Sequence, residues 1–408
     1  MAPPASVPIQ AARSQRGLDW LNFFIADVET AFGPFVAVYL ASHGWRQGEI
    51  GSVLTVNATI ALATQIPSGA IVDWTAHKRT VVAICLFFIA AGAILIGSIP
   101  TYPAVLLGEA MHGITGGAVR TALASIALGI VGHRTFHTRV GRNQRYDSLG
   151  NAATAAAMGV LGAYVSPQAP FFAAAGLCVP AFLTLQLINP KDIDYARARA
   201  AEGRREPKAA RWRELARNWR LVVFTACLFL FQFANASLLP LAGERLAAHY
   251  RAESEVVTAA LVIVPQLVAA VLAGWVGRKA DEWGRRRPLI IGFAVLPLEA
   301  VLFAIAPGPW FMVGVQVLGG FTAVVIGTMT PLVVADVVRR SGRFNFAFGA
   351  VSMMSGIGAA ISTSAIGFVA QTMGFEVGFL ALALVALLGV GLLVWKLPET
   401  SYEAKRDD

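Results

Sequence analysis

Charged residues are scarce in this chain of 408 residues, because Asp, Glu, Lys and Arg make up only 14% of it. An average soluble domain carries about 25%. So few charges cannot cover a water-facing surface, which excludes an ordinary soluble globular protein. The three cysteines all lie inside apolar stretches, which excludes a disulfide framework and a cysteine-rich zinc site. The sequence also lacks a nucleophile beside a base and a phosphate-binding loop, so we expect no enzymatic activity, no metal and no cofactor.

Apolar residues are abundant instead: 56% of the chain is hydrophobic, and the mean hydropathy is +0.62. Apolar runs recur along almost the whole chain, and about 20 such residues suit a hydrocarbon core about 30 Å thick. The sequence therefore predicts an all-α membrane protein with twelve spans. The predicted spans are 18–41, 49–72, 79–99, 103–131, 147–166, 169–189, 219–242, 254–277, 288–306, 309–338, 345–371 and 374–396.

Basic residues collect in alternate loops between these spans. With a cytoplasmic N-terminus, 29 of the 33 Lys and Arg residues fall on the cytoplasmic side, which fits the positive-inside rule and an even number of crossings. We therefore expect an integral protein of the plasma (bacterial inner) membrane with both termini cytoplasmic. Nucleic-acid binding is not expected, because that needs the net charge of +9 gathered on one folded face.

The chain divides into two similar halves. The predicted organisation is an N-tail at 1–17, a six-helix bundle at 18–189, a basic cytoplasmic linker at 190–218, a second bundle at 219–396 and a C-tail at 397–408. We expect the linker to set topology and to attract anionic lipid head groups. Matched polar positions recur at nearly equal offsets in residue number, which indicates a parallel repeat about an axis along the membrane normal. The matched pairs are Asp73 and Asp281, Glu29 and Asn235, and Glu109 and Gln316.

The loop from Gly277 to Arg286 resembles the signature loop Gly-x-x-x-Asp-Arg-x-Gly-Arg-Arg of the major facilitator superfamily, and the segment from Gly69 to Arg79 is a degraded copy of it. The resemblance implies two six-helix bundles around a central cavity and transport by alternating access. We expect the loop residues to hold one side of the carrier closed, although they also fit a role in topology alone. These gating candidates are Gly69, Asp73, Lys78, Arg79, Gly277, Asp281, Gly284, Arg285, Arg286 and Asp336.

Ionisable residues inside spans are costly and are therefore functional candidates. Asp27 and Glu29 lie in the first span, about 200° apart around a helix, and Arg120 lies at a similar depth in the fourth. We favour Glu29 and Asn235 as cavity residues, with either carboxylate pairing with Arg120. A carboxylate in such a cavity can load and release a proton, so Asp27 or Glu29 is the expected coupling site. The alternative is a permanent ion pair with Arg120.

Glu109 occupies the place where the fourth-span pattern of the family often carries Arg, and it is expected to be a second proton site or a rim residue. We expect Glu299 to serve packing or helix bending. The other cavity candidates are Asn57, Gln266 and Gln316. The sequence thus predicts a monomeric secondary transporter that moves a small solute with protons, by symport or antiport. An uncoupled facilitator and a transport-dead membrane sensor are the alternatives.

Overall fold

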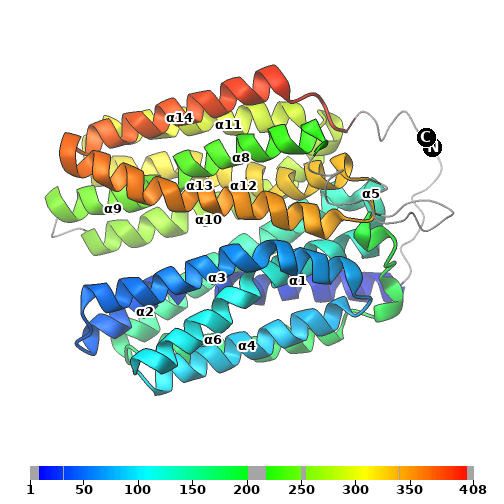
Figure 1. The fold of residues 1–408 in the computed structure, drawn as a ribbon, viewed down its shortest axis with the longest axis horizontal. Helices are drawn as coiled ribbons and strands as arrows, with labels where there is room; N and C mark the ends of the chain where they lie inside the picture. Colours follow the sequence, from blue (N-terminus) through cyan, green and yellow to red (C-terminus); the bar gives the residue numbers. More distant parts are fainter. Residues whose placement is uncertain (1–8, 31, 201–216, 250–253, 340, 402–408) are drawn as a thin grey trace. The chain divides into compact units, whose positions relative to one another are not determined.

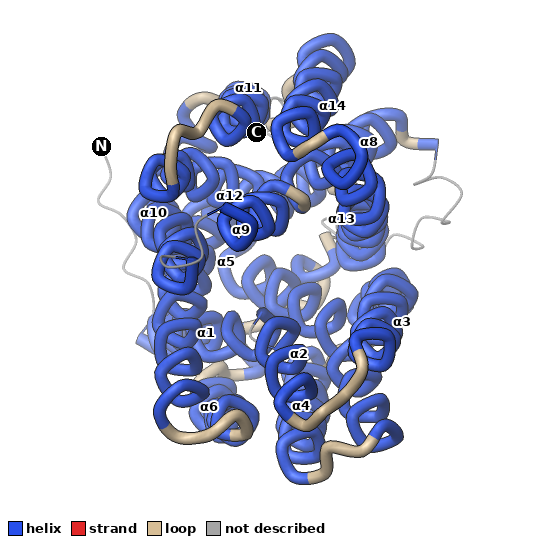
Figure 2. The backbone as a smooth tube through the Cα atoms, turned by 90° about the vertical axis from the view of Figure 1, so that its left-hand side faces the viewer, coloured by secondary structure: helices blue, strands red, loops and turns tan. Residues whose placement is uncertain are grey.

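The computed structural model describes residues 9–30, 32–200, 217–249, 254–339 and 341–401. The regular secondary structure of these residues is helical throughout, and they contain no strand (Figures 1 and 2). The ends of the predicted tails and the middle of the predicted linker, 201–216, lie outside the described residues.

The chain forms two compact units. The first comprises Met1–Ala209 together with Arg339–Gly349, and the second comprises Ala210–Val338 together with Ala350–Asp408. Helix α13 (Phe344–Met373) therefore starts in the first unit and continues in the second. The other helices of the first unit are α1 (Ile9–Thr30), α2 (Phe32–Ser42), α3 (Gln47–Trp74), α4 (Lys78–Ser98), α5 (Tyr102–Tyr164), α6 (Ala169–Gln186) and the short 3-10 helices η1 (Pro190–Asp192) and η2 (Arg197–Arg199). Those of the second unit are α8 (Trp219–Ala236), α9 (Leu238–His249), α10 (Ser254–Glu282), α11 (Arg286–Ala304), α12 (Pro309–Val337) and α14 (Phe375–Lys396).

The described helices match the twelve predicted spans. Ten helical segments are long and apolar enough to cross a membrane, and the one formed by α5 is 61 residues long, enough for two crossings. Helices α1 and α2 together supply the remaining span. The seventh span is divided into two helices, since α8 ends at Ala236 and α9 begins at Leu238. The corresponding place in the first span, residue 31, lies outside the described residues.

The predicted loop at 132–146 is wrong beyond Gly132, because α5 consists of two helices that meet at this residue and the second continues to Tyr164. Gly132, at φ 70°, is the one residue of α5 outside the helical region of backbone space. Glycine takes this left-handed conformation without steric cost, so the chain changes direction within a single residue. The following segment, 133–146, contains no proline and has four Arg residues, and Arg is a good helix former. Its polarity suggested a loop, whereas its helix propensity decides the structure.

The start of the predicted linker is folded rather than solvated. Ala198 and Ala200 are fully buried, and the carbonyl of Ala198 accepts a hydrogen bond of 2.8 Å from the Ser125 hydroxyl on α5. At the other end of this segment, the Ser14 hydroxyl on α1 donates to Asp192 at 2.5 Å. The segment 190–200 is therefore part of the first unit.

Glycines close equivalent helix seams in both units. A β-carbon on Gly113 of α5 would lie 2.8 Å from the carbonyl oxygen of Asn57 on α3. A β-carbon on Gly320 of α12 would lie 2.6 Å from the carbonyl oxygen of Pro265 on α10. Close approach of this kind needs glycine. Gly113 and Gly320 occupy corresponding positions in the repeat, so these two glycine contacts are evidence of the repeat in the structure.

Candidate functional site

The cavity residues predicted from the first, fourth and seventh spans are placed as follows. Asp27 and Glu29 lie on α1, but their side chains are outside the described residues, so their pairing with Arg120 stays a prediction. Arg120 is exposed on α5 of the first unit. Asn235 is half-buried on α8 of the second unit, two residues before the helix break at Ser237.

Buried Glu109 of α5 forms a polar pair with half-buried Asn57 of α3. Glu109 is fully buried, at 0% exposure, and the Asn57 amide donates a hydrogen bond to its Oε2. Its Oε1 is also buried and has no hydrogen-bond partner among the described residues. Glu109 lies seven residues after the start of α5, so its interpretation as a proton site or as a rim residue stays a prediction.

This arrangement determines what Glu109 can do chemically. Within the described part of the chain, Glu109 makes no ion pair, so its negative charge would have only one amide donor to stabilise it. An ionised carboxylate that is buried without a cation is strongly disfavoured, and protonation removes the cost. Glu109 is thus suited to binding a proton and to releasing it when water or a cation reaches it.

The first copy of the signature loop anchors the start of α13. Asp73, at the end of α3, accepts hydrogen bonds from the backbone N–H groups of Asn345 at 3.2 Å and Phe346 at 2.8 Å, and from the Asn345 side chain at 2.7 Å. A carboxylate at a helix N-terminus satisfies free N–H groups and favours the helix dipole. A β-carbon on Gly69 would clash with the Asn345 carbonyl oxygen, so only glycine fits there.

Two basic residues of this loop, Lys78 and Arg79, form hydrogen bonds within the first unit. Lys78 is fully buried at the start of α4, and its Nζ donates to the Val72 carbonyl at 2.5 Å. Arg79 donates to Oε1 of Gln186 on α6 at 2.9 Å. Lys78 therefore ties the two sides of the loop together and Arg79 ties it to α6, which keeps Asp73 at the start of α13.

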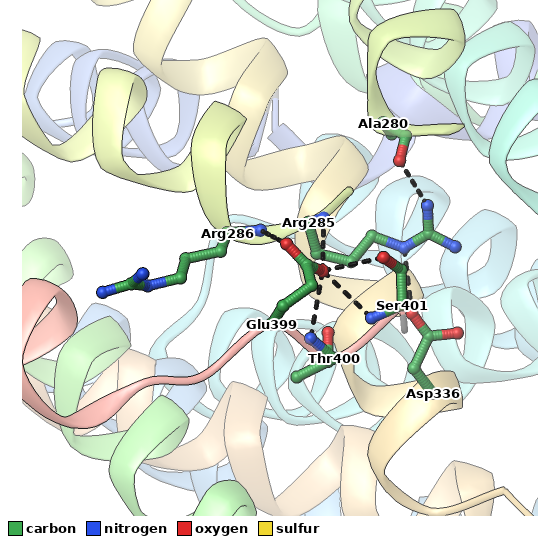
Figure 3. A network of polar contacts seen from close by, with 7 residues as sticks. All are labelled: Ala280, Arg285, Arg286, Asp336, Glu399, Thr400 and Ser401. Carbon is green, nitrogen blue, oxygen red and sulfur yellow. Dashed lines mark hydrogen bonds and ion pairs between the residues drawn. The ribbon is translucent and has the colours of Figure 1, made fainter. Parts of the chain in front are cut away.

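The second copy forms a network in the second unit, drawn in Figure 3. Arg285 donates to Asp336 on α12 at 2.9 Å and to the Ala280 carbonyl at 2.6 Å. Outside the view of the figure, Arg286 donates to the Val394 carbonyl of α14 at 2.7 Å. Of the remaining predicted gating residues, Gly277 is buried and Asp281 is exposed. Asp281 thus differs from Asp73, its partner in the repeat, and the two loop copies are not equivalent.

Glu399 is the centre of this network. Its Oε1 accepts hydrogen bonds from the Arg285 N–H at 2.8 Å and from the Ser401 N–H and hydroxyl at 3.0 and 2.8 Å, while Oε2 accepts one from the Arg286 N–H at 3.1 Å (Figure 3). Burial raises the pKa of this carboxyl, but the hydrogen bonds from Ser401, Arg285 and Arg286 lower it by more, so it lies below its ordinary value. Glu399 is therefore a carboxylate cap at the start of α11.

Sequence reasoning missed two residues of these networks. Glu399 had a weak signal, since Leu397-Pro398-Glu399-Thr400 resembles a fragment found in sugar carriers. Asn345 had none, because a single Asn at the start of a span is an ordinary helix cap. The polar candidates Gln266 on α10 and Gln316 on α12 are half-buried and buried, respectively.

Comparisons with known proteins agree with this architecture. The model of the Major Facilitator Superfamily matches residues 19–296 and 224–408. The uncharacterized MFS-type transporter Rv2456c of Mycobacterium tuberculosis is 37% identical over 394 residues, which cover 95% of this chain and 94% of the relative. Its counterpart MT2531 from another strain of that species matches equally well.

Solved structures show the same fold. The human organic anion transporter MFSD10 superposes with a TM-score of 0.72 at 16% identity, covering 96% of this chain and all of that one. A variant of the Escherichia coli fucose:proton symporter FucP superposes with a TM-score of 0.73 at 14% identity, covering 94% and 98%. The family match and the 37% identical relative, together with this shared fold, show that the chain is a membrane transporter that belongs to the major facilitator superfamily.

Proposed function

We propose that this protein is a proton-coupled secondary transporter, which carries a small solute by alternating access as a symporter or antiporter. The observation that carries the proposal is the buried carboxyl of Glu109, which pairs with Asn57 and makes no ion pair within the described residues. In this proposal the protein lies in the plasma (bacterial inner) membrane with both termini cytoplasmic, as the distribution of Lys and Arg favours.

Coupling requires a group whose proton affinity changes as access switches from one side to the other. A carboxyl that is neutral while buried and ionised when hydrated does this, because hydration removes the desolvation cost of the charge. Asn57 supports both states, since an amide donates to an ionised carboxylate and accepts from a protonated one. Asp27 and Glu29 of α1 stay candidates for the same role, with Arg120 and Asn235 as cavity residues.

The fold is compatible with this chemistry. FucP is a fucose:proton symporter with the same fold, so this architecture accommodates proton coupling. At 14% identity the likeness carries no argument about cargo.

Alternating access also requires a contact that forms and breaks. Asp73 is suited to this, because it caps the start of α13, a helix that begins in the first unit and continues in the second. Movement of the rest of α13 would pull Asn345 and Phe346 away from the carboxylate. The Arg285, Asp336 and Glu399 network lies entirely in the second unit and would move with it as one body.

The experiment begins with finding a solute. Purified protein is screened by thermal shift against organic anions, sugars, amphipathic drugs and metal chelates, because a ligand stabilises the folded state that binds it. Flux of any solute that raises the melting temperature is then measured in proteoliposomes, with and without an imposed proton gradient. Wild-type flux should respond to the gradient.

The variant Glu109→Gln separates coupling from transport. It should lose the response to the gradient and keep solute exchange at zero gradient, because it remains neutral throughout the cycle. Glu376→Gln, which neutralises an exposed acid in the first turn of α14, should behave as wild type. Flux that ignores the gradient in the wild type would overturn coupling and leave a facilitator, and binding without any flux would indicate a sensor.

A further inference from the structure

Glu299 is a second acid buried inside the protein, on α11 of the second unit. It is 2% exposed, and its Oε2 has no hydrogen-bond partner within the described residues. It lies five residues before the end of a 19-residue helix, hence about 8 Å inside that end at 1.5 Å per residue. An acid in such a place is costly, so the packing role expected from the sequence does not account for it.

The space around Glu299 is made by a glycine on α12. A β-carbon on Gly319 would lie 2.7 Å from Oε1 of Glu299 and 2.6 Å from Oε1 of Gln316. Both side chains therefore converge on the place that a larger residue would fill. Gln316 is itself 5% exposed, so the carboxyl and the amide share a small buried volume.

The equivalent place in the first unit contains no acid. The repeat that aligns Glu109 with Gln316 aligns Gly92 of α4 with Glu299. Gly92 and Gly108 of α5 touch through their backbones, since a β-carbon on either would lie 3.0 Å from the carbonyl oxygen of the other. In the first unit, α4 and α5 therefore pack closely through two glycines and without an acid. Glu299 is not needed to join α11 and α12.

The two units nevertheless contain pairs of similar chemistry. Gln316 is the counterpart of Glu109 in the repeat, but Glu299 corresponds to Gly92 and not to Asn57, so the pair Glu299 and Gln316 is similar to Glu109 and Asn57 in chemistry and not in position. In each pair one carboxyl is buried beside one amide, and the carboxyl has an oxygen without a partner among the described residues.

Arg245, on a helix packed against α11, is engaged away from Glu299. Arg245 of α9 donates to the carbonyls of Phe303 at 2.8 Å, Ala304 at 3.3 Å and Ala306 at 3.3 Å, beyond Glu299 along the chain. Within the described part of the chain, Glu299 makes no ion pair. Among the described side chains, the remaining titratable groups on the helices packed against α11 are Arg220 and the buried thiol Cys227 on α8, Glu244 on α9, Arg278, Lys279, Asp281 and Glu282 on α10, Asp336 on α12, and Glu376 and Lys396 at the ends of α14.

We propose that Glu299, together with Gln316, is a second proton-binding site, so that each unit carries one carboxyl that takes up and releases a proton during transport. The proposal extends the proton coupling proposed for Glu109. A protonated Glu299 donates to the amide oxygen of Gln316, and rotation of that amide presents its NH₂ group to an ionised Glu299. The pair therefore accommodates both protonation states.

Infrared spectroscopy tests this without knowledge of the solute. The carbonyl stretch of protonated carboxyl groups is followed while the pH of purified full-length protein in lipid is raised. The wild type should show a buried protonated carboxyl that disappears on titration and is lost in Glu299→Gln. Gln316→Leu should shift its midpoint to higher pH, because the ionised form loses its amide donor. Glu376→Gln is the control and should change neither the infrared signal of the protonated carboxyl nor its titration midpoint.

The outcomes distinguish this site from the proposed function. If Glu109→Gln removes a titrating signal and Glu299→Gln removes none, proton binding at Glu109 stands and the second site is overturned. A Glu299 signal that persists to the highest pH at which the protein stays folded would also overturn it, since a permanently protonated acid carries no proton through a cycle. If Glu299→Gln fails to fold, the titration midpoint of the buried carboxyl in Gln316→Leu decides the question. A shift to higher pH supports the second site, and an unchanged midpoint overturns it.

Discussion

Gly284 and Glu399 are packed so closely that a β-carbon on the glycine would lie 2.5 Å from Oε2 of the carboxylate. Gly284 has φ +77°, a left-handed conformation that disfavours other residues. Glycine is thus required here both for its backbone conformation and for the space beside it. The carboxylate reaches the start of α11 through this gap, which fastens the segment after α14 to α11.

Gly284→Ala should therefore destabilise the protein. Left-handed backbone costs a residue with a side chain about 1–3 kcal/mol, and the added methyl group also displaces Glu399. We expect a lower melting temperature in detergent. Gly391→Ala is the matched control, because this helical glycine of α14 has open space around its β-carbon position, and its melting temperature should be unchanged or higher. Equal melting temperatures for Gly284→Ala and the wild type would contradict the packing.

Glu399 should make stability depend on pH in acid. Its pKa is lower in the folded protein than its ordinary value of 4.5, so its contribution is complete above pH 4.5 and is lost as the pH falls through the folded value. Glu399→Gln should cost about 1.5–3 kcal/mol at neutral pH, the worth of hydrogen bonds to a charged group.

Melting temperatures measured from neutral pH down to about pH 3 give the check. The difference between wild type and Glu399→Gln should shrink below pH 4.5, where protonation removes the advantage of the carboxylate. Glu376→Gln, which lacks an exposed acid at the start of α14, should give a curve parallel to that of the wild type. A constant difference down to pH 3 would rule out the ionised cap.

The sequence located these loops better than their partners. Gly69, Asp73, Gly284 and Arg285 follow from the signature pattern, because glycine spacing and charge at a span end are local features. Asn345 lies 272 residues from Asp73 in the chain. A partner at that distance depends on how helices pack, and one sequence contains no periodic signal for such a contact.

The helix break in the seventh span was predictable in kind but not in position. Pro240 marks this span as interrupted, and α9 begins two residues before the proline, at Leu238. A proline ring clashes with the carbonyl four residues earlier and leaves it without a donor, so the break lies on the N-terminal side. Buried acids were also recognisable, but only packing distinguishes Glu299, which faces Gln316, from a residue that bends a helix.

Asp73 and Asn345 should be energetically coupled. Asp73→Ala removes the acceptor for two backbone N–H groups and one side-chain amide, and Asn345→Ala removes one of those same bonds. Residues in direct contact show interaction energies of about 0.5–3 kcal/mol. A double-mutant cycle, measured by unfolding in mixed micelles with increasing SDS, should therefore give a double variant less destabilised than the sum of the two single variants.

Thr59→Ala is the control partner for Asp73→Ala in a second cycle. Thr59 is exposed on α3, its hydroxyl donates to the Thr55 carbonyl of the same helix, and it lies about 21 Å from Asp73 along the helix axis. Its effect should add to that of Asp73→Ala within about 0.3–0.5 kcal/mol. Additivity in both cycles would mean that Asp73 stabilises α13 only by accepting hydrogen bonds from the backbone N–H groups of α13. Coupling with Asn345 and not with Thr59 would mean that the side-chain amide of Asn345 also helps to hold α13 to α3.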